Sequence, residues 1–247
     1  MRYLLIASLA LFVACGEEKP KDYDPQQLID QSIEAHGATF KGKRVSFDFR
    51  SRSYSVEREK FKYTYTREWQ DDSLGYVQDI LVNSSQLTRI VEGDTVSLDE
   101  EWTQKYSSSV NSVLYFFQVP YVLNDRGAIK KYVGEFEMKG QKYLGVQVTF
   151  SEDGGGEDHE DVFIYWIHAE NKTVDFFAYS YLTEGGGVRF REAINRHEVK
   201  GLIVQDYVNY KAEKGTELKT LPALFDEGKL EELSIISNER VKVSVLE

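Results

Sequence analysis

The chain has 247 residues, with 41 acidic and 30 basic side chains and a formal net charge of −11 at pH 7. Such an acidic balance argues against nucleic acid as a partner and against electrostatic docking on anionic lipid. The length fits one domain or at most two, and 16 Tyr and 14 Phe are typical of a protein with a large sheet surface.

The first residues predict a secretory signal. Arg2 precedes an apolar run from Leu4 to Ala14, which is 11 residues long and too short for the roughly 20 residues of a membrane-spanning helix. Cys15, the only cysteine of the chain, follows directly. A lone thiol cannot form an internal disulfide, whereas a lipid anchor requires one thiol at this place. We expect a signal peptide over 1–14; an ordinary signal that happens to contain a cysteine is the alternative.

The string Leu11-Phe12-Val13-Ala14-Cys15 resembles the lipobox of bacterial lipoproteins. It departs at Phe12, where that family usually has Leu. The resemblance implies cleavage before Cys15, a diacylglycerol on its sulfur and usually an acyl chain on its nitrogen, such as palmitate. Two or more acyl chains are what a stable membrane anchor needs. The polar residues 15–23 would then form a lipidated tether, and residues 24–247 a single folded domain.

Two helices are predicted before and within a series of strands. Asp24 is a suitable N-cap for a first helix, with Pro25 at its first position, His36 in its last turn and Gly37 as its C-terminal cap. A second helix is predicted over 106–117 from apolar residues at helical spacing, ended by Pro120. Its last turns are apolar almost all round, which is typical either of a core element or of a lid over an apolar cavity.

Strands dominate the rest of the chain. Alternation of apolar and polar residues predicts ten to twelve antiparallel strands joined by short turns. They are expected over 45–49, 61–69, 76–82, 87–91, 96–98, 132–138, 143–150, 162–167, 174–182, 188–194, 202–210 and 241–245, with a short helical piece over 222–233. Residues 162–167 are apolar on both faces, so both faces must be covered. The expected fold is mainly β with a few helices (α+β), a curved antiparallel sheet or half-open barrel whose concave face the helices cover.

Two glycine-containing loops, 151–160 and 183–187, are expected at the same end of the sheet, near Arg189 and Arg191. A salt-linked rim is one interpretation of the acids there. A calcium site is the second, although the loop lacks the EF-hand and β-roll patterns; a pair of catalytic carboxylates is the third. The candidate calcium ligands are Asp153, Asp158 and Asp161.

Other catalytic and cofactor patterns are missing from the sequence. The four histidines occur singly, without zinc-ligand spacing, and there is no nucleophile elbow. The glycine runs link expected strands rather than a strand to a helix, so neither forms a phosphate-binding loop. We therefore expect no cofactor and no enzymatic activity.

The segments 161–168, 174–182 and 185–192, with 109–116 and 199–210, look like those of a family of uncharacterised Bacteroidota lipoproteins, over most of the chain. A more distant similarity is to outer-membrane lipoprotein carrier and sorting proteins, in the strand Val162 to His168, the return strand Val174 to Leu182, and Val199 to Val204. That resemblance implies a half-open antiparallel barrel with helices over an apolar concavity that takes acyl chains.

The leading expectation is a membrane-anchored envelope lipoprotein of the outer membrane that binds a lipid or other apolar ligand. A structural or accessory lipoprotein without a small ligand is the first alternative. A secreted hydrolase that uses the acids near 153–161 is the second. The candidate pocket residues are aromatic or aliphatic, and a plain core would explain them as well: Phe61, Tyr63, Tyr65, Val113, Phe116 and Phe117.

Overall fold

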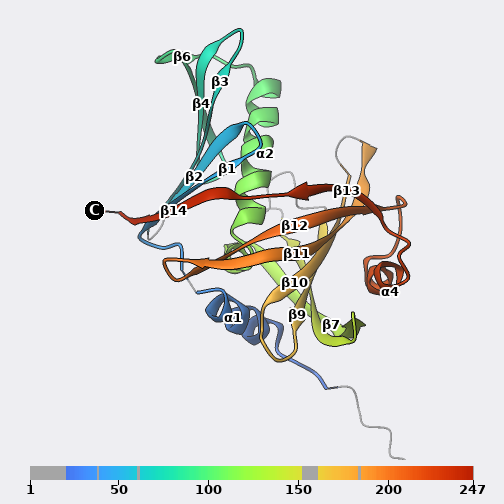
Figure 1. The fold of residues 1–247 in the computed structure, drawn as a ribbon. Coiled ribbons are helices and arrows are strands. Elements are labelled where there is room, and N and C mark those ends of the chain that lie inside the picture. The colour runs from blue at the N-terminus through green and yellow to red at the C-terminus, as the bar shows by residue number, and fades with distance from the viewer. Residues whose placement is uncertain (1–20, 38, 60–61, 152–160, 183–184, 247) are drawn as a thin grey trace, which may run out of the picture.

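A computed structural model describes residues 21–37, 39–59, 62–151, 161–182 and 185–246. Within them the chain forms two antiparallel seven-stranded sheets, neither closed into a barrel, with three α-helices. The expected mainly β fold with curved antiparallel sheets and a few helices is confirmed (Figure 1). The strands divide into two sheets, however, where a single curved sheet was one expectation. No helix in this part of the chain is both long and apolar enough to cross a bilayer.

The first sheet has the order β14-β1-β2-β3-β4-β5-β6. Its strands are β1 (Lys43–Phe49), β2 (Arg52–Arg58), β3 (Tyr63–Asp71), β4 (Gly75–Val82), β5 (Gln86–Val91), β6 (Asp94–Val96) and β14 (Glu239–Val245). All but β14 are neighbours in sequence, so the sheet is a meander closed at one edge by the end of the chain.

The second sheet has the order β13-β12-β11-β10-β9-β8-β7. Its strands are β7 (Ala128–Met138), β8 (Gln141–Phe150), β9 (Val162–His168), β10 (Val174–Tyr181), β11 (Gly187–Val199), β12 (Leu202–Ala212) and β13 (Glu231–Ile236). The connection from β13 to β14 leads the chain from the second sheet back to the first (Figure 1).

The helices are α1 (Pro25–Ala35), α2 (Glu100–Phe117) and α4 (Leu221–Asp226), with 3-10 turns η1 (Tyr121–Asn124) and η4 (Leu218–Thr220). The predicted capping of α1 is confirmed, since Asp24 accepts a hydrogen bond from the Gln26 N–H and Pro25 is the first helical residue. The prediction of a helix ending before Pro120 is confirmed too, and α2 begins earlier than expected, where Asp99 caps it.

Two parts of the prediction were wrong. The described residues form 14 strands rather than roughly ten to twelve, because β2 was not expected and β13 was taken in part as helix. The helix after Pro222 ends at Asp226, and Glu231–Ile236 is instead an edge strand with mostly exposed residues. An edge strand on the surface has little need of apolar alternation, so its sequence carries a weak strand signal.

Both faces of the second sheet are buried, as the sequence of β9 predicted. Phe163, Tyr165 and Ile167 lie in a cluster with α1 residues and with Phe116 of α2. Ile164 and Trp166 lie on the other face, in a cluster with residues of α4. The first sheet contributes a third cluster, in which Val110 and Leu114 of α2 pack on Val45, Phe47 and Val56.

A charged row lies inside the first sheet, beneath the N-terminal half of α2. Arg67 and Arg89 flank Asp79 on neighbouring strands. Asp79 is fully buried, and its Oδ2 accepts hydrogen bonds from Arg67 Nη2 at 2.6 Å and Arg89 Nη2 at 2.9 Å. The guanidinium of Arg89 also lies 3.3 Å from the ring centre of Tyr106. One carboxylate thus serves two buried cations, and aromatic rings offset the remaining positive charge.

We expect Asp79→Asn to lower the free energy of unfolding by about 3–5 kcal/mol, because it leaves two buried guanidinium groups without a counter-charge. Urea unfolding followed by circular dichroism measures the change. Glu101→Gln, which removes an exposed ion pair with Lys105 on α2, is the control and should cost at most about 0.5 kcal/mol. Equal effects of the two substitutions would contradict the structural role of Asp79.

His36 ends α1 and fastens it to the second sheet. Its Nε2 accepts a hydrogen bond from the Val174 N–H at 3.1 Å, and its carbonyl oxygen accepts one from the Ile203 N–H at 3.0 Å. Gly37 follows with φ +81°, and a Cβ there would meet the carbonyl oxygen of Gly201, so the close approach requires glycine. Burial, reinforced by the charge of Arg196, lowers the pKa of His36 from 6.5 to about 4.

We expect His36 to make the protein acid-sensitive. Between pH 6.5 and 4 the unfolded chain binds a proton that folded His36 does not, so stability falls as the pH falls. The loss should reach roughly 3 kcal/mol at pH 4 relative to His36→Gln, which keeps an acceptor for Val174 but does not titrate. Unfolding at pH 7.5, 5.5 and 4 measures the difference. The exposed His197→Gln variant should follow the wild type, and a parallel decline of His36→Gln and wild type would contradict the assignment.

Candidate functional site

A cavity of about 160 Å³ lies between the C-terminal half of α2 and the second sheet. The first sheet contributes the end of β1, and the connection from β13 to β14 forms another wall. The lining residues are Phe49, Ser112, Val113, Phe116, Phe117, Tyr179, Arg191, Tyr207, Ile236 and Asn238. Well-packed proteins contain few voids larger than a water molecule, so a cavity of this size is the leading candidate site.

The structure divides the sequence-predicted pocket residues into two groups. Val113, Phe116 and Phe117 of α2 line the cavity together. Tyr63 and Tyr65 lie on β3 in the first sheet, away from the cavity lining, and Phe61 lies outside the described residues. The structure therefore brings together the helical candidates and separates them from the strand candidates.

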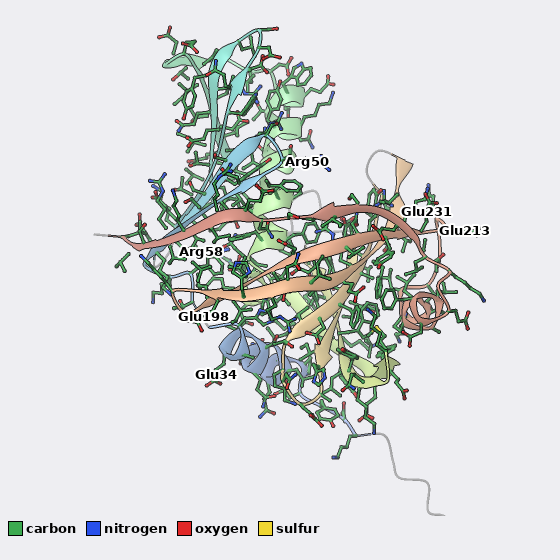
Figure 2. The ribbon with its side chains drawn as sticks, viewed as in Figure 1. Glu34, Arg50, Arg58, Glu198, Glu213 and Glu231 are labelled. Atoms are coloured by element: carbon green, nitrogen blue, oxygen red, sulfur yellow. The ribbon has the colours of Figure 1, made fainter. Side chains whose placement is uncertain are left out.

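Tyr65 belongs instead to a buried polar junction between the first sheet and the end of α2. Its hydroxyl accepts a hydrogen bond from Gln118 Nε2 at 2.9 Å and lies 3.3 Å from Nη2 of Arg58. Arg58, labelled in Figure 2, makes a bidentate ion pair with Asp125 through Nη1 at 3.0 Å and Nη2 at 2.8 Å. These contacts secure the end of α2 and η1 on the first sheet.

Aromatic rings of the second sheet form the floor of the cavity. The ring of Phe116 stacks on Phe177 with centres 5.4 Å apart and lies 5.0 Å from the ring centre of Tyr179. Tyr207 is buried on the same face, and its hydroxyl accepts a hydrogen bond from Gln205 Nε2 at 2.7 Å. Burial raises the pKa of Tyr207, so its phenol stays protonated at neutral pH.

One wall of the cavity is held by hydrogen bonds from the sheet connection. The Asn238 N–H donates to Asp206 Oδ1 at 2.8 Å, and its side-chain Nδ2 donates to the Gln205 carbonyl oxygen at 2.9 Å. Asp206 lies on β12, so these bonds fix the place where the chain leaves the second sheet. The cavity wall is thereby tied to the strand that carries Tyr207.

The expected placement of Arg189 and Arg191 on one face of a strand is borne out by the register of β11 with β10 and β12. Neither makes an ion pair with a carboxylate among the described residues. The acids of the predicted rim, including Asp153 and Asp158, lie outside those residues, whereas Asp161 precedes β9. The same part of the chain contains no group of three potential metal ligands.

Sequence reasoning missed the contribution of the sheet to the cavity. Tyr179 and Tyr207 belong to alternating aromatic positions, which the sequence shows, but their common location depends on strand order and on where α2 docks. A second void, beside His36 and Gln118, measures about 20 Å³. That volume suits about one water molecule, so it is not a comparable ligand site.

Comparison with solved structures identifies the fold. A LolA superfamily protein from Nitrosomonas europaea aligns over 92% of this chain and 96% of that chain, with a TM-score of 0.54 and 10% identity. A DUF1329 family protein from Desulfovibrio piger aligns over 89% and 93%, with a TM-score of 0.46 and 10% identity. A putative outer membrane lipoprotein-sorting protein domain from Vibrio parahaemolyticus aligns over 90% and 94%, with a TM-score of 0.40 and 5% identity.

The first of these alignments shows that the chain has a LolA-like fold, in agreement with the distant resemblance found in its sequence. No curated protein sequence matches the chain. A family model described as "Family of unknown function (DUF6503)" matches residues 3–238, nearly the whole length. The chain therefore belongs to the DUF6503 family.

Proposed function

We propose that the protein is a non-enzymatic envelope lipoprotein whose cavity under α2 binds the acyl part of a lipid or another apolar ligand. Residues 1–14 act as its signal peptide, Cys15 carries the lipid anchor in the outer membrane, and residues 15–23 are the tether. Residues 24–247 form the ligand-binding domain. The cavity is the observation that carries this proposal.

The chemistry of the cavity supports an apolar ligand. Phe49, Val113, Phe116, Phe117 and Ile236 supply hydrocarbon surface from both sheets and from α2. Dry apolar cavities of about 150 Å³ bind molecules such as benzene. The volume of about 160 Å³ thus suits a short stretch of hydrocarbon chain, and a longer chain requires α2 to move away from the second sheet.

The fold supports the same proposal. A LolA-like fold places helices over an open antiparallel sheet, and its resemblance to lipoprotein carriers implies space for acyl chains. Fold alone does not assign function, so the lining of this particular cavity carries more weight. The hydrolase alternative depends on acids at 153–160, which lie outside the described residues, and no observed contact favours it.

We expect organic extraction of purified protein to release a non-covalently bound lipid, identified by mass spectrometry. Val113→Trp fills the cavity with an indole ring and should reduce the recovered lipid several-fold, at a stability cost of about 1–3 kcal/mol. Gln104→Trp, at an exposed position of the same helix, is the control and should leave recovery unchanged. Lipid-free wild-type protein that also fails to bind added octanol would favour an accessory lipoprotein without a small ligand.

We expect Cys15→Ser to abolish membrane attachment, because no other residue can carry the thioether-linked lipid. Metabolic labelling with alkyne-palmitate and separation of membrane and soluble fractions measure this. The wild type should be labelled and sediment with membranes, whereas the variant should be unlabelled and soluble. A labelled, membrane-bound variant would contradict the assignment of the anchor while leaving the cavity proposal intact.

A further inference from the structure

Arg191 is a buried cation on the floor of the cavity. It is 8% exposed and lines the cavity from β11. In the strand register it lies between Phe177 on β10 and Asn209 on β12. Its guanidinium carbon is 4.1 Å from the ring centre of Phe116 and 5.4 Å from that of Phe177. The charge therefore lies among aromatic rings that belong to the proposed binding site.

The guanidinium has little to bind within the described residues. Its Nη2 donates to the Tyr179 hydroxyl at 3.1 Å, and its buried Nε has no hydrogen-bond partner. No carboxylate of this part of the chain is within ion-pair distance of it. Leaving a buried charge uncompensated is costly, and aromatic rings offset only part of that cost.

The other buried arginines of the described residues are paired. Arg58 binds Asp125, and Arg67 and Arg89 share Asp79. Each of these three guanidinium groups thus has a carboxylate of the chain as its counter-charge. Arg191 is the exception, and it is the one that faces the cavity.

Two phenols next to Arg191 add unused donors. The hydroxyl of Tyr179 accepts from Arg191, and that of Tyr207 accepts from Gln205. A phenol has one proton to donate, and no group among the described residues accepts the proton of either hydroxyl. Both tyrosines line the cavity. One cation and two hydroxyls therefore offer hydrogen bonds in a cavity whose remaining lining is mostly apolar.

We propose that Arg191 binds the carboxylate of a fatty acid whose hydrocarbon chain lies in the cavity. This inference rests on the proposed function and names the ligand class. A planar carboxylate matches the fork of parallel N–H donors that a guanidinium presents. The phenols of Tyr179 and Tyr207 complete its hydrogen bonding, and the rings of α2 and the sheet surround the chain.

The net charge of the protein bears on how an anionic ligand could bind. With a formal charge of −11, the molecule as a whole repels anions, so an anionic ligand requires a local cation that is shielded from solvent. Arg191 provides such a cation. A neutral ester or amide of a fatty acid can accept a hydrogen bond from Arg191 but supplies no counter-charge.

The test compares octanoate with methyl octanoate at pH 7.5 by calorimetric titration of the full chain. The two probes share a hydrocarbon chain and differ in charge. Wild-type protein should bind octanoate about ten- to one-hundred-fold more tightly. Arg191→Met, which keeps an apolar side chain of similar length under Phe116, should lose this preference and retain binding of the ester. Arg189→Met, two residues away on the same face, is the matched control and should retain the preference.

Tyr207→Phe provides a second variant that removes a single hydroxyl. It should weaken the binding of octanoate severalfold without affecting the binding of methyl octanoate. This variant provides the test if Arg191→Met fails to fold. Equal affinity of the wild type for both probes would overturn the carboxylate site and leave the apolar cavity standing. Binding of neither probe would overturn the proposed function itself. Unchanged discrimination in both variants would also reject Arg191 as the binding group.

Discussion

The architecture depends on one helix that serves two sheets. Val110, Leu114 and Phe117 form a stripe at helical spacing that packs on the first sheet, where Phe117 stacks on Phe47 at 3.8 Å. Tyr115 and Phe116 point to the second sheet, where they meet Phe163. A helix that is apolar nearly all round needs protein on both sides. Because α2 cannot fill both interfaces, the cavity remains between its last turns and the second sheet.

Charged groups support this arrangement from the side of the first sheet. The Arg67–Asp79–Arg89 row lies under the N-terminal half of α2, with Arg67 Nη1 donating to Ser109 of the helix at 2.7 Å. At the other end, Gln118 accepts from Arg58 at 2.6 Å and donates to the Leu114 carbonyl oxygen. The middle and the C-terminal end of the helix are thus bonded to the first sheet, so movement of α2 relative to the second sheet is the way to enlarge the cavity.

The sequence predicted those elements whose burial is apolar and periodic. The capping of α1, the end of α2 and the two buried faces of β9 all follow from local patterns. It failed at β2, where Ser55 and Arg58 are buried polar residues that interrupt the apolar signal. The burial of Arg67 could not be predicted for the same reason. A charged residue is expected to be exposed unless its partners, here on β4 and α2, are known.

The candidate site, too, could be predicted from the sequence only in part. Val113, Phe116 and Phe117 were accessible to sequence reasoning because an apolar helix end requires a second partner surface. Tyr179, Arg191 and Tyr207 come from three strands whose register brings them together under α2. The sequence indicated that Arg189 and Arg191 share a face of the strand, but only the fold shows that they differ in burial. Arg189 lies against Tyr181 near the loop end, while Arg191 is buried one step further in.

The buried position of Arg191 determines the chemistry of the site. The other buried arginines of the described residues, Arg58, Arg67 and Arg89, each pair with a carboxylate of the chain, at the expense of ordering both groups. At the cavity the described residues supply aromatic rings and phenols but no carboxylate. An internal carboxylate would have neutralised the floor and made the cavity a binding site for neutral molecules. Because no lining residue is a carboxylate, a ligand can supply the counter-charge of Arg191. The apolar lining of the same cavity can hold the hydrocarbon chain of that ligand.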